Sequence, residues 1–267
     1  MNEKILPPVR PNVGVKLRYR AQMLSLIEEM NESILYWLTA QYRDAPPLLA
    51  QDARPYPSKE IQKRFKELAA RWSKRFNKAA PKIAEAYLKG SFKATDSAMR
   101  AALKKAGISV KFQMTPAMKD AFNASLSENV GLIKSIPDQY LLQVEGIVSR
   151  SYAAGRDLET MVKSLRSLYP KAQNRAILIA RDQSNKANAV VERARRLELG
   201  IVEAEWMHSG GGKHPRPEHV KAGKEHRRFK VAEGCPIKNE KGELEFILPG
   251  EKINCRCVSR PVIPGLT

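Results

Sequence analysis

Every histidine and every cysteine of this chain lies in its last 60 residues, and the preceding 207 residues contain neither. The hydrophobic spacing changes near the same boundary, because apolar residues repeat with a helical period up to Gly200 and follow strand-like patterns beyond it. This segregation predicts an α+β protein, with a mostly α-helical N-terminal and central region and a small mixed α/β C-terminal module. The residues that mark the module are His208, His214, His219, His226, Cys235, Cys255 and Cys257.

The first half of the chain predicts a series of helices. Residues 15–42 have one apolar face, and a second helix begins near Ser58. Pro81 and Gly90 are expected to bound a third, short helix, because proline suits a first helical turn and glycine often ends one. Residues 108–114 alternate apolar and polar side chains, which predicts a short strand or an extended link. The expected core of the first helix is Leu17, Met23 or Leu24, Ile27, Met30, Ile34 and Leu38.

The C-terminal module predicts strands after helices that end at Gly200. We expect strands over 201–208 and 255–263. Residues 228–247 predict a hairpin that turns near 238–242.

The chain is strongly basic, with a net charge of +19, and the charge is unevenly distributed. Residues 59–119 contain sixteen Lys and Arg against four acids. Such a concentrated positive field favours a polyanionic partner, either nucleic acid or an acidic protein surface. A solvated helix face is the alternative. The candidate nucleic-acid-binding residues lie opposite the apolar face of the second helix: Lys59, Lys63, Arg64, Lys66, Arg71, Lys74 and Lys78.

Neither secretion nor membrane insertion is indicated by the sequence. Met1 is followed by no apolar signal-peptide segment, and no apolar run approaches the length of a membrane span. Three cysteines, two of them separated by one residue, make a poor disulfide framework and favour a reducing cytosolic origin.

The closing Cys-Arg-Cys indicates a possible metal site. In an extended backbone the thiols of Cys255 and Cys257 project to the same side. Such a pair is half of a structural zinc site, and His219 is the candidate third ligand. The alternative is that both cysteines are reduced thiols packed as small hydrophobic side chains. The candidates for a fourth zinc ligand are His226, His214 and Cys235.

A catalytic metal centre is disfavoured by the spacing of the histidine motif. The segment from His214 to His219 resembles an inverted zinc-protease motif but has one residue too many before Glu218. Pro215 and Pro217 also disfavour the continuous helix that would align the two histidines. We therefore assign no catalytic residue and expect no enzyme activity.

A set of landmarks, taken in order, is similar to that of the phage head morphogenesis family, also called phage Mu F-like or SPP1-type minor head proteins. The resemblance covers roughly the C-terminal half of the chain. This chain has Ser209–Lys213 where the family often has an acidic residue, so no role of that acid is carried over. The landmarks are Ile179-Ala-Arg-Asp-Gln183, Trp206, Arg216-Pro-Glu-His219, Gly223, Pro249-Gly250 and Cys255-Arg256-Cys257.

The resemblance implies a low-copy virion component that is made in the host cytoplasm and lies in the phage head near the portal. Its implied partners are the portal protein and the major capsid protein. Phage DNA as a further partner is suggested by the charge of the basic segment, which the resemblance does not cover. The corresponding domains are an arm, helix and Pro-rich connector (1–57), a basic helical region (58–130) and a head morphogenesis domain (131–267). The alternative is a metal-dependent nucleic-acid-processing enzyme or toxin-like domain that uses the His/Cys cluster.

Overall fold

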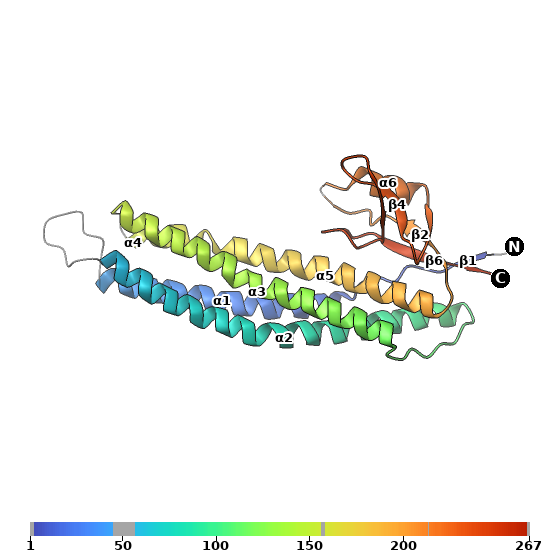
Figure 1. The fold of residues 1–267 in the computed structure, drawn as a ribbon, viewed down its shortest axis with the longest axis horizontal. Coiled ribbons are helices and arrows are strands. Elements are labelled where there is room, and N and C mark those ends of the chain that lie inside the picture. The colour runs from blue at the N-terminus through green and yellow to red at the C-terminus, as the bar shows by residue number, and fades with distance from the viewer. Residues whose placement is uncertain (1–2, 45–56, 156–157, 213, 266–267) are drawn as a thin grey trace. The chain divides into compact units, whose positions relative to one another are not determined.

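The computed structural model describes residues 3–44, 57–155, 158–212 and 214–265, and it has the predicted α+β fold (Figure 1). The predicted Pro-rich connector falls largely on 45–56, outside the described residues. No helix in the described ranges has the length and hydrophobicity needed to cross a membrane. The elements in chain order are β1 (Glu3–Ile5), α1 (Val13–Asp44), α2 (Pro57–Lys105), α3 (Pro116–Ala153), α4 (Leu158–Arg166), α5 (Tyr169–Glu198), β2 (Glu203–Met207), α6 (Pro217–Lys224), β3 (Arg228–Lys230), β4 (Cys235–Lys238), β5 (Leu244–Ile247) and β6 (Val258–Pro264).

The chain divides into two compact units. One contains residues 18–84 and 128–179 and is helical. The other contains residues 1–17, 85–127 and 180–267 and includes all the strands. Four helices therefore contribute residues to both units: α1, α2, α3 and α5. The division into domains 1–57, 58–130 and 131–267 stays a prediction.

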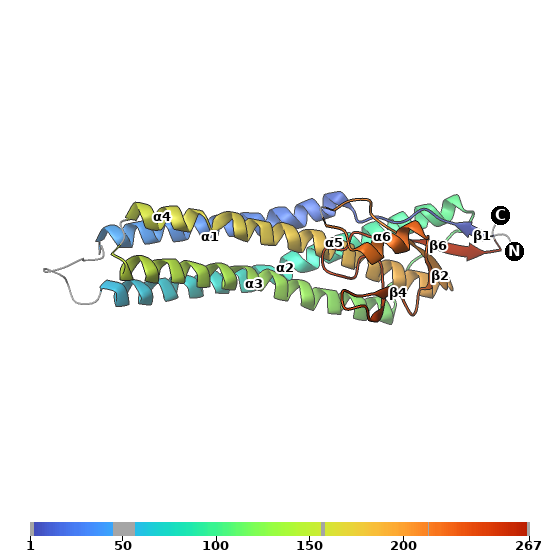
Figure 2. The same cartoon turned by 90° about the horizontal axis from the view of Figure 1, so that it is seen from above.

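The helical unit is a bundle whose helices run side by side (Figures 1 and 2). The hydroxyl of Tyr140 on α3 donates a hydrogen bond of 2.7 Å to Asn31 on α1. The predicted apolar face of α1 is confirmed, since five of its residues are fully buried. Leu17 was wrongly predicted as core, because 42% of it is exposed. The buried residues are Met23, Ile27, Met30, Ile34 and Leu38.

Helix α2 is continuous from Pro57 to Lys105, so the predicted helix boundaries at Pro81 and Gly90 are wrong. Pro81 lies on an exposed face of the helix. Gly90 permits a close approach, because a Cβ there would lie 3.3 Å from Cγ1 of Val15. Packing against Val15 thus accommodates Gly90 inside the helix, whereas Pro81 is accommodated on its solvent side.

Two antiparallel sheets form the β part of the second unit. The four-stranded sheet has the order β1-β6-β2-β3, and β4 pairs with β5 in the predicted hairpin. Residues 108–114 form no strand. Their alternation arises because Ile108, Val110 and Phe112 pack against a small core around Leu103 and Leu6.

Candidate metal centre

His219, Cys255 and Cys257 come together in the C-terminal module, as predicted from their residue types. Nδ1 of His219 lies 3.5 Å from the sulfur of Cys255 and 3.9 Å from the sulfur of Cys257. The three potential ligand atoms lie within 4.8 Å of one another, and all three side chains are buried. One imidazole nitrogen and two sulfurs in this arrangement could hold a metal ion.

Helix α6 positions the histidine. Pro217 stands at its start, where a fixed φ and a missing N–H are both tolerated. The backbone N–H of His219 donates to the carbonyl of Arg216 over 3.1 Å. The guanidinium of Arg216 in turn donates to the carbonyl of Ile253. The beginning of α6 is thereby tied to the loop that carries both cysteines.

Gly223 allows α6 to pack closely on the segment that follows β2. A Cβ at this position would lie 2.4 Å from Cβ of His208, much closer than two carbon atoms can approach. Any larger residue would therefore displace the helix that carries His219.

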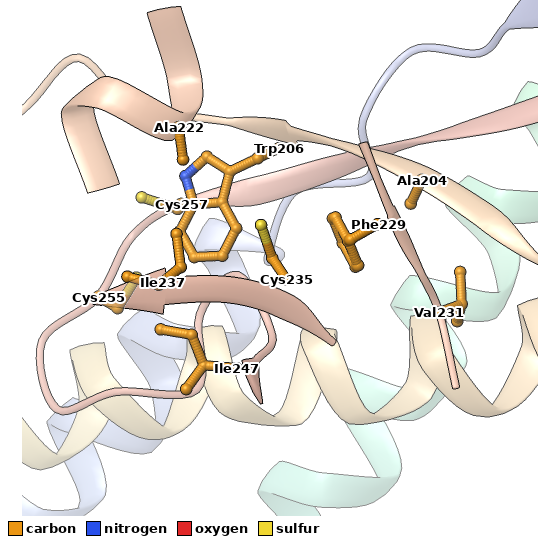
Figure 3. Packing of buried hydrophobic residues seen from close by; sticks show 10 residues of the cluster. All are labelled: Ala204, Trp206, Ala222, Phe229, Val231, Cys235, Ile237, Ile247, Cys255 and Cys257. Carbon is orange, nitrogen blue, oxygen red and sulfur yellow. The ribbon is translucent and has the colours of Figure 1, made fainter. Parts of the chain in front are cut away.

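Trp206 fills the core beside Cys255 and Cys257 (Figure 3). Its side chain is fully buried, and its ring meets the ring of His219 edge-on, with 5.1 Å between the centroids. Trp206 thus anchors strand β2 in the core. Such an aromatic contact restricts the orientation of the imidazole.

The two thiols are held in unequal electrostatic environments. The pKa of Cys255 is lowered, because Cys257 and then His219 hydrogen-bond to its sulfur and favour the thiolate. The backbone N–H groups of Cys257 and Gly250 act in the same direction. The pKa of Cys257 is raised, first because its thiol is hydrogen-bonded to the sulfur of Cys255 and then because it is buried. The pair therefore loses its first proton readily and resists losing the second.

None of the three candidates for a fourth ligand is grouped with these donors. His226 is exposed, and its Nδ1 contacts Glu205 at 2.6 Å. His214 is also exposed. Cys235 is buried in the same hydrophobic core, but burial raises the pKa of its thiol to about 11. Among the described residues, the structure groups only His219 with the two cysteines.

A further set of contacts holds the cysteine loop against α5, and sequence reasoning missed it. Asp182 accepts a hydrogen bond from the backbone N–H of Asn254 over 2.7 Å, and Arg181 donates to the Asn254 side chain over 2.9 Å. Gly250 has a φ of 89°, and a Cβ there would lie 3.2 Å from the carbonyl of Asn185. One sequence signal could have indicated this contact. Arg181 and Asp182 belong to one head morphogenesis landmark, and Asn254 directly precedes another.

The basic candidates on α2 lie where the helical period predicts them. The opposite face is buried and includes Phe65, Trp72 and Phe76. The indole N–H of Trp72 donates to Ser33 on α1 over 3.2 Å. The seven candidates are all exposed: Lys59, Lys63, Arg64, Lys66, Arg71, Lys74 and Lys78.

Comparison with known proteins finds a relative of undefined role. The chain is 32% identical over 156 residues to an uncharacterized protein of Haemophilus influenzae. The match covers 58% of this chain but 32% of the relative, so the chain spans about a third of that protein's length. No protein-family model matches the chain. No solved structure matches it either.

Proposed function

We propose that this chain is a phage minor head protein, a low-copy virion component near the portal that binds the portal and major capsid proteins. The observation that carries the proposal is that the head morphogenesis landmarks meet at one centre. Trp206, His219 and the two cysteines are far apart in sequence, yet they belong to one buried cluster. Residues that pack into one centre depend on one another, so we expect the members of a protein family to keep them together and in the same order.

The other landmarks also have physical roles around this centre. Arg216 binds the carbonyl of Ile253, Gly223 makes room for His208, and Gly250 makes room for the backbone of Asn185. These contacts support reading the landmarks as one folded module rather than as scattered similarities.

We further propose that the module is stabilised by a zinc ion on His219, Cys255 and Cys257. Zinc binds nitrogen at about 2.0 Å and sulfur at about 2.3 Å, so tetrahedral geometry separates a nitrogen and a sulfur ligand by about 3.5 Å. The observed separations of 3.5 and 3.9 Å fit this requirement with little movement. Backbone N–H groups near the sulfurs add the outer interactions that orient thiolate ligands.

The head-protein proposal is tested by deleting the gene from the phage or prophage that carries it and purifying the particles. We expect heads from the parent to contain the chain at far fewer copies than the major capsid protein. We expect the deletion to lower the yield of infectious particles, and a plasmid copy of the gene to restore it. Absence of the chain from purified parental heads that contain portal protein would overturn the proposal.

The zinc proposal is tested on the purified chain by elemental analysis and thermal unfolding. We expect about one zinc per chain, and a lower melting temperature after chelation. Cys255→Ser should lose the metal. Cys235→Ser is the matched control, because it removes a buried thiol from the same core and should retain the metal. Equal metal content in the two variants would contradict the assignment.

A second candidate function, a metal-dependent nucleic-acid-processing enzyme, draws support from the same three ligands, because catalytic zinc sites commonly have three protein ligands. The discriminating experiment measures cleavage of DNA and RNA by the zinc-loaded chain and by His219→Ala. Cleavage that His219→Ala abolishes would favour the enzyme, whereas zinc binding without cleavage favours the head protein.

A further inference from the structure

We propose that the zinc site has a fourth coordination position that is open to a small anion from solution. This inference rests on the zinc site proposed above. Tetrahedral zinc needs four ligands, and sites closed to other molecules obtain all four from protein side chains. Sites that exchange a ligand obtain three from the protein and leave one position for a molecule from outside.

The described side chains supply three donors to this site. The pair formed by His226 and Glu205 lies at a different place, where Arg260 also binds the same carboxylate at 2.5 Å. Cys235 shares the core, but the structure does not group its sulfur with the three donors. Within the described ranges, no further His, Cys, Asp or Glu joins the three within 4.8 Å.

A surface groove leads to the histidine of the site. Its volume is about 700 Å³, and His219 forms part of its wall between α6 and the β4–β5 hairpin. Carboxylates and cations both line it, so the groove does not exclude an anion by its charge. The cations are Arg216, Lys238, Lys241 and Lys252, and the carboxylates are Glu218, Glu240, Glu243 and Glu245.

The segment that follows β2 is poor in side chains and begins beside the cysteines. The backbone N–H of Ser209 donates a hydrogen bond to the sulfur of Cys257. Gly210, Gly211 and Gly212 follow and are exposed. A Cβ on Gly212 would lie 3.0 Å from the guanidinium of Arg256.

The size of the site and the donor preference of zinc define the class of ligand. Both cysteines are 4% exposed and His219 is 5% exposed, so only a ligand of a few atoms fits without unfolding the loop. Two thiolates balance the charge of Zn²⁺, and a borderline-soft ion accepts nitrogen or sulfur donors. Azide meets these requirements and serves as the probe.

The experiment replaces zinc by Co²⁺ in the full chain and follows the visible absorption bands of the ion during titration with sodium azide. Sodium chloride at equal ionic strength is added in the reference titration. We expect a saturable shift of the bands with azide while dialysis shows that the cobalt stays bound. Cys235→Ser should give the same shift, and Cys255→Ser should bind cobalt more than tenfold more weakly.

The outcomes separate this inference from the one on which it rests. Cobalt bound without any azide-dependent change would mean a closed site, and it would overturn the open position while leaving the metal site intact. Failure of the wild-type chain to bind cobalt or zinc would overturn both. A saturable shift that Cys235→Ser retains would support the open position.

Discussion

The backbone N–H of Asn254 donates a hydrogen bond of 2.7 Å to Oδ1 of Asp182, and this bond fixes the cysteine loop to α5. Asn254 has a φ of 59°, in the left-handed region that asparagine tolerates better than most residues. The bond therefore holds an unusual backbone conformation immediately before Cys255. The geometry of the candidate metal centre depends on a helix residue that is not one of its ligands.

Asp182→Ala should weaken the loop and the metal site together. A buried hydrogen bond to a charged group contributes about 1.5–3 kcal/mol to stability. Loss of an outer-shell partner typically lowers metal affinity by about 10- to 100-fold. Urea unfolding and competition with a chelator measure the two effects. Asp182→Asn should be milder, because its amide oxygen can still accept the bond. Asp120→Ala is the control at an exposed acid, and an equal effect there would refute the role of Asp182.

Arg195→Ala should destabilise the unit that contains the sheets by about 3–5 kcal/mol. Its side chain is 2% exposed and donates two hydrogen bonds to the carboxylate of Asp96, at 2.9 and 2.8 Å. It also binds the carbonyl of Gln113 and stacks on Phe112. Removing the cation would leave a partly buried carboxylate without this partner.

Arg195→Lys tests geometry as distinct from charge, because lysine cannot make the paired contact with a carboxylate. We expect a smaller but clear loss of stability in urea unfolding. Arg193→Ala is the control, because Arg193 lies on the same helix and is exposed. A loss below about 0.5 kcal/mol for Arg195→Ala would be in the range of ordinary surface substitutions and would contradict this role.

The stability of the chain should fall as the pH rises from about 4.5 to 7 through the titration of Glu192. Burial raises the pKa of this carboxyl to about 7, against the opposing influence of Arg196 and Asn188. In this range the folded state holds a proton that the unfolded state has released, so folding is favoured at the acidic end. The loss approaches a limit of about 1.4 kcal/mol per pH unit.

Glu192→Gln should flatten this part of the pH profile, measured as the free energy of unfolding at a series of pH values. Glu85→Gln is the control, because Glu85 is exposed and pairs with Lys89 in an ion pair within α2. Identical slopes for the wild type and Glu192→Gln would show that Glu192 does not titrate in this range.

Binding of duplex DNA should fall steeply with salt and depend little on sequence, if the basic face of α2 neutralises phosphates. The triple variant Lys66→Ala, Lys74→Ala and Lys78→Ala should reduce the slope of log affinity against log salt by about 0.9 for each phosphate that is no longer neutralised. The charge-matched control replaces Lys221, Lys224 and Lys238 with alanine. Equal reductions in both variants would indicate a general effect of net charge. Binding that does not depend on salt would contradict phosphate neutralisation and favour an acidic protein as the partner of this face.

The local patterns that the sequence predicted correctly are those that depend on near neighbours. The 3.6-residue period identified the buried faces of α1 and α2, because each face is a property of one helix. The turn residues between β4 and β5 identified the hairpin for the same reason. The pairing of His219 with Cys255 and Cys257 was predicted from their metal-binding side chains alone, without knowledge of the distances.

Tertiary contacts decided what local patterns could not. The sequence predicted helix boundaries at Pro81 and Gly90, but packing against Val15 favours glycine inside a continuous helix. It left a short strand and an extended link open at 108–114, and packing against the core around Leu103 favours a connecting segment that pairs with no strand. It left three candidates for a fourth ligand open, because spacing does not tell which histidine faces the cysteines. The folded chain directs His226 to Glu205 and His219 to the thiols, since strand register and the Asp182–Asn254 contact fix which side chains can meet.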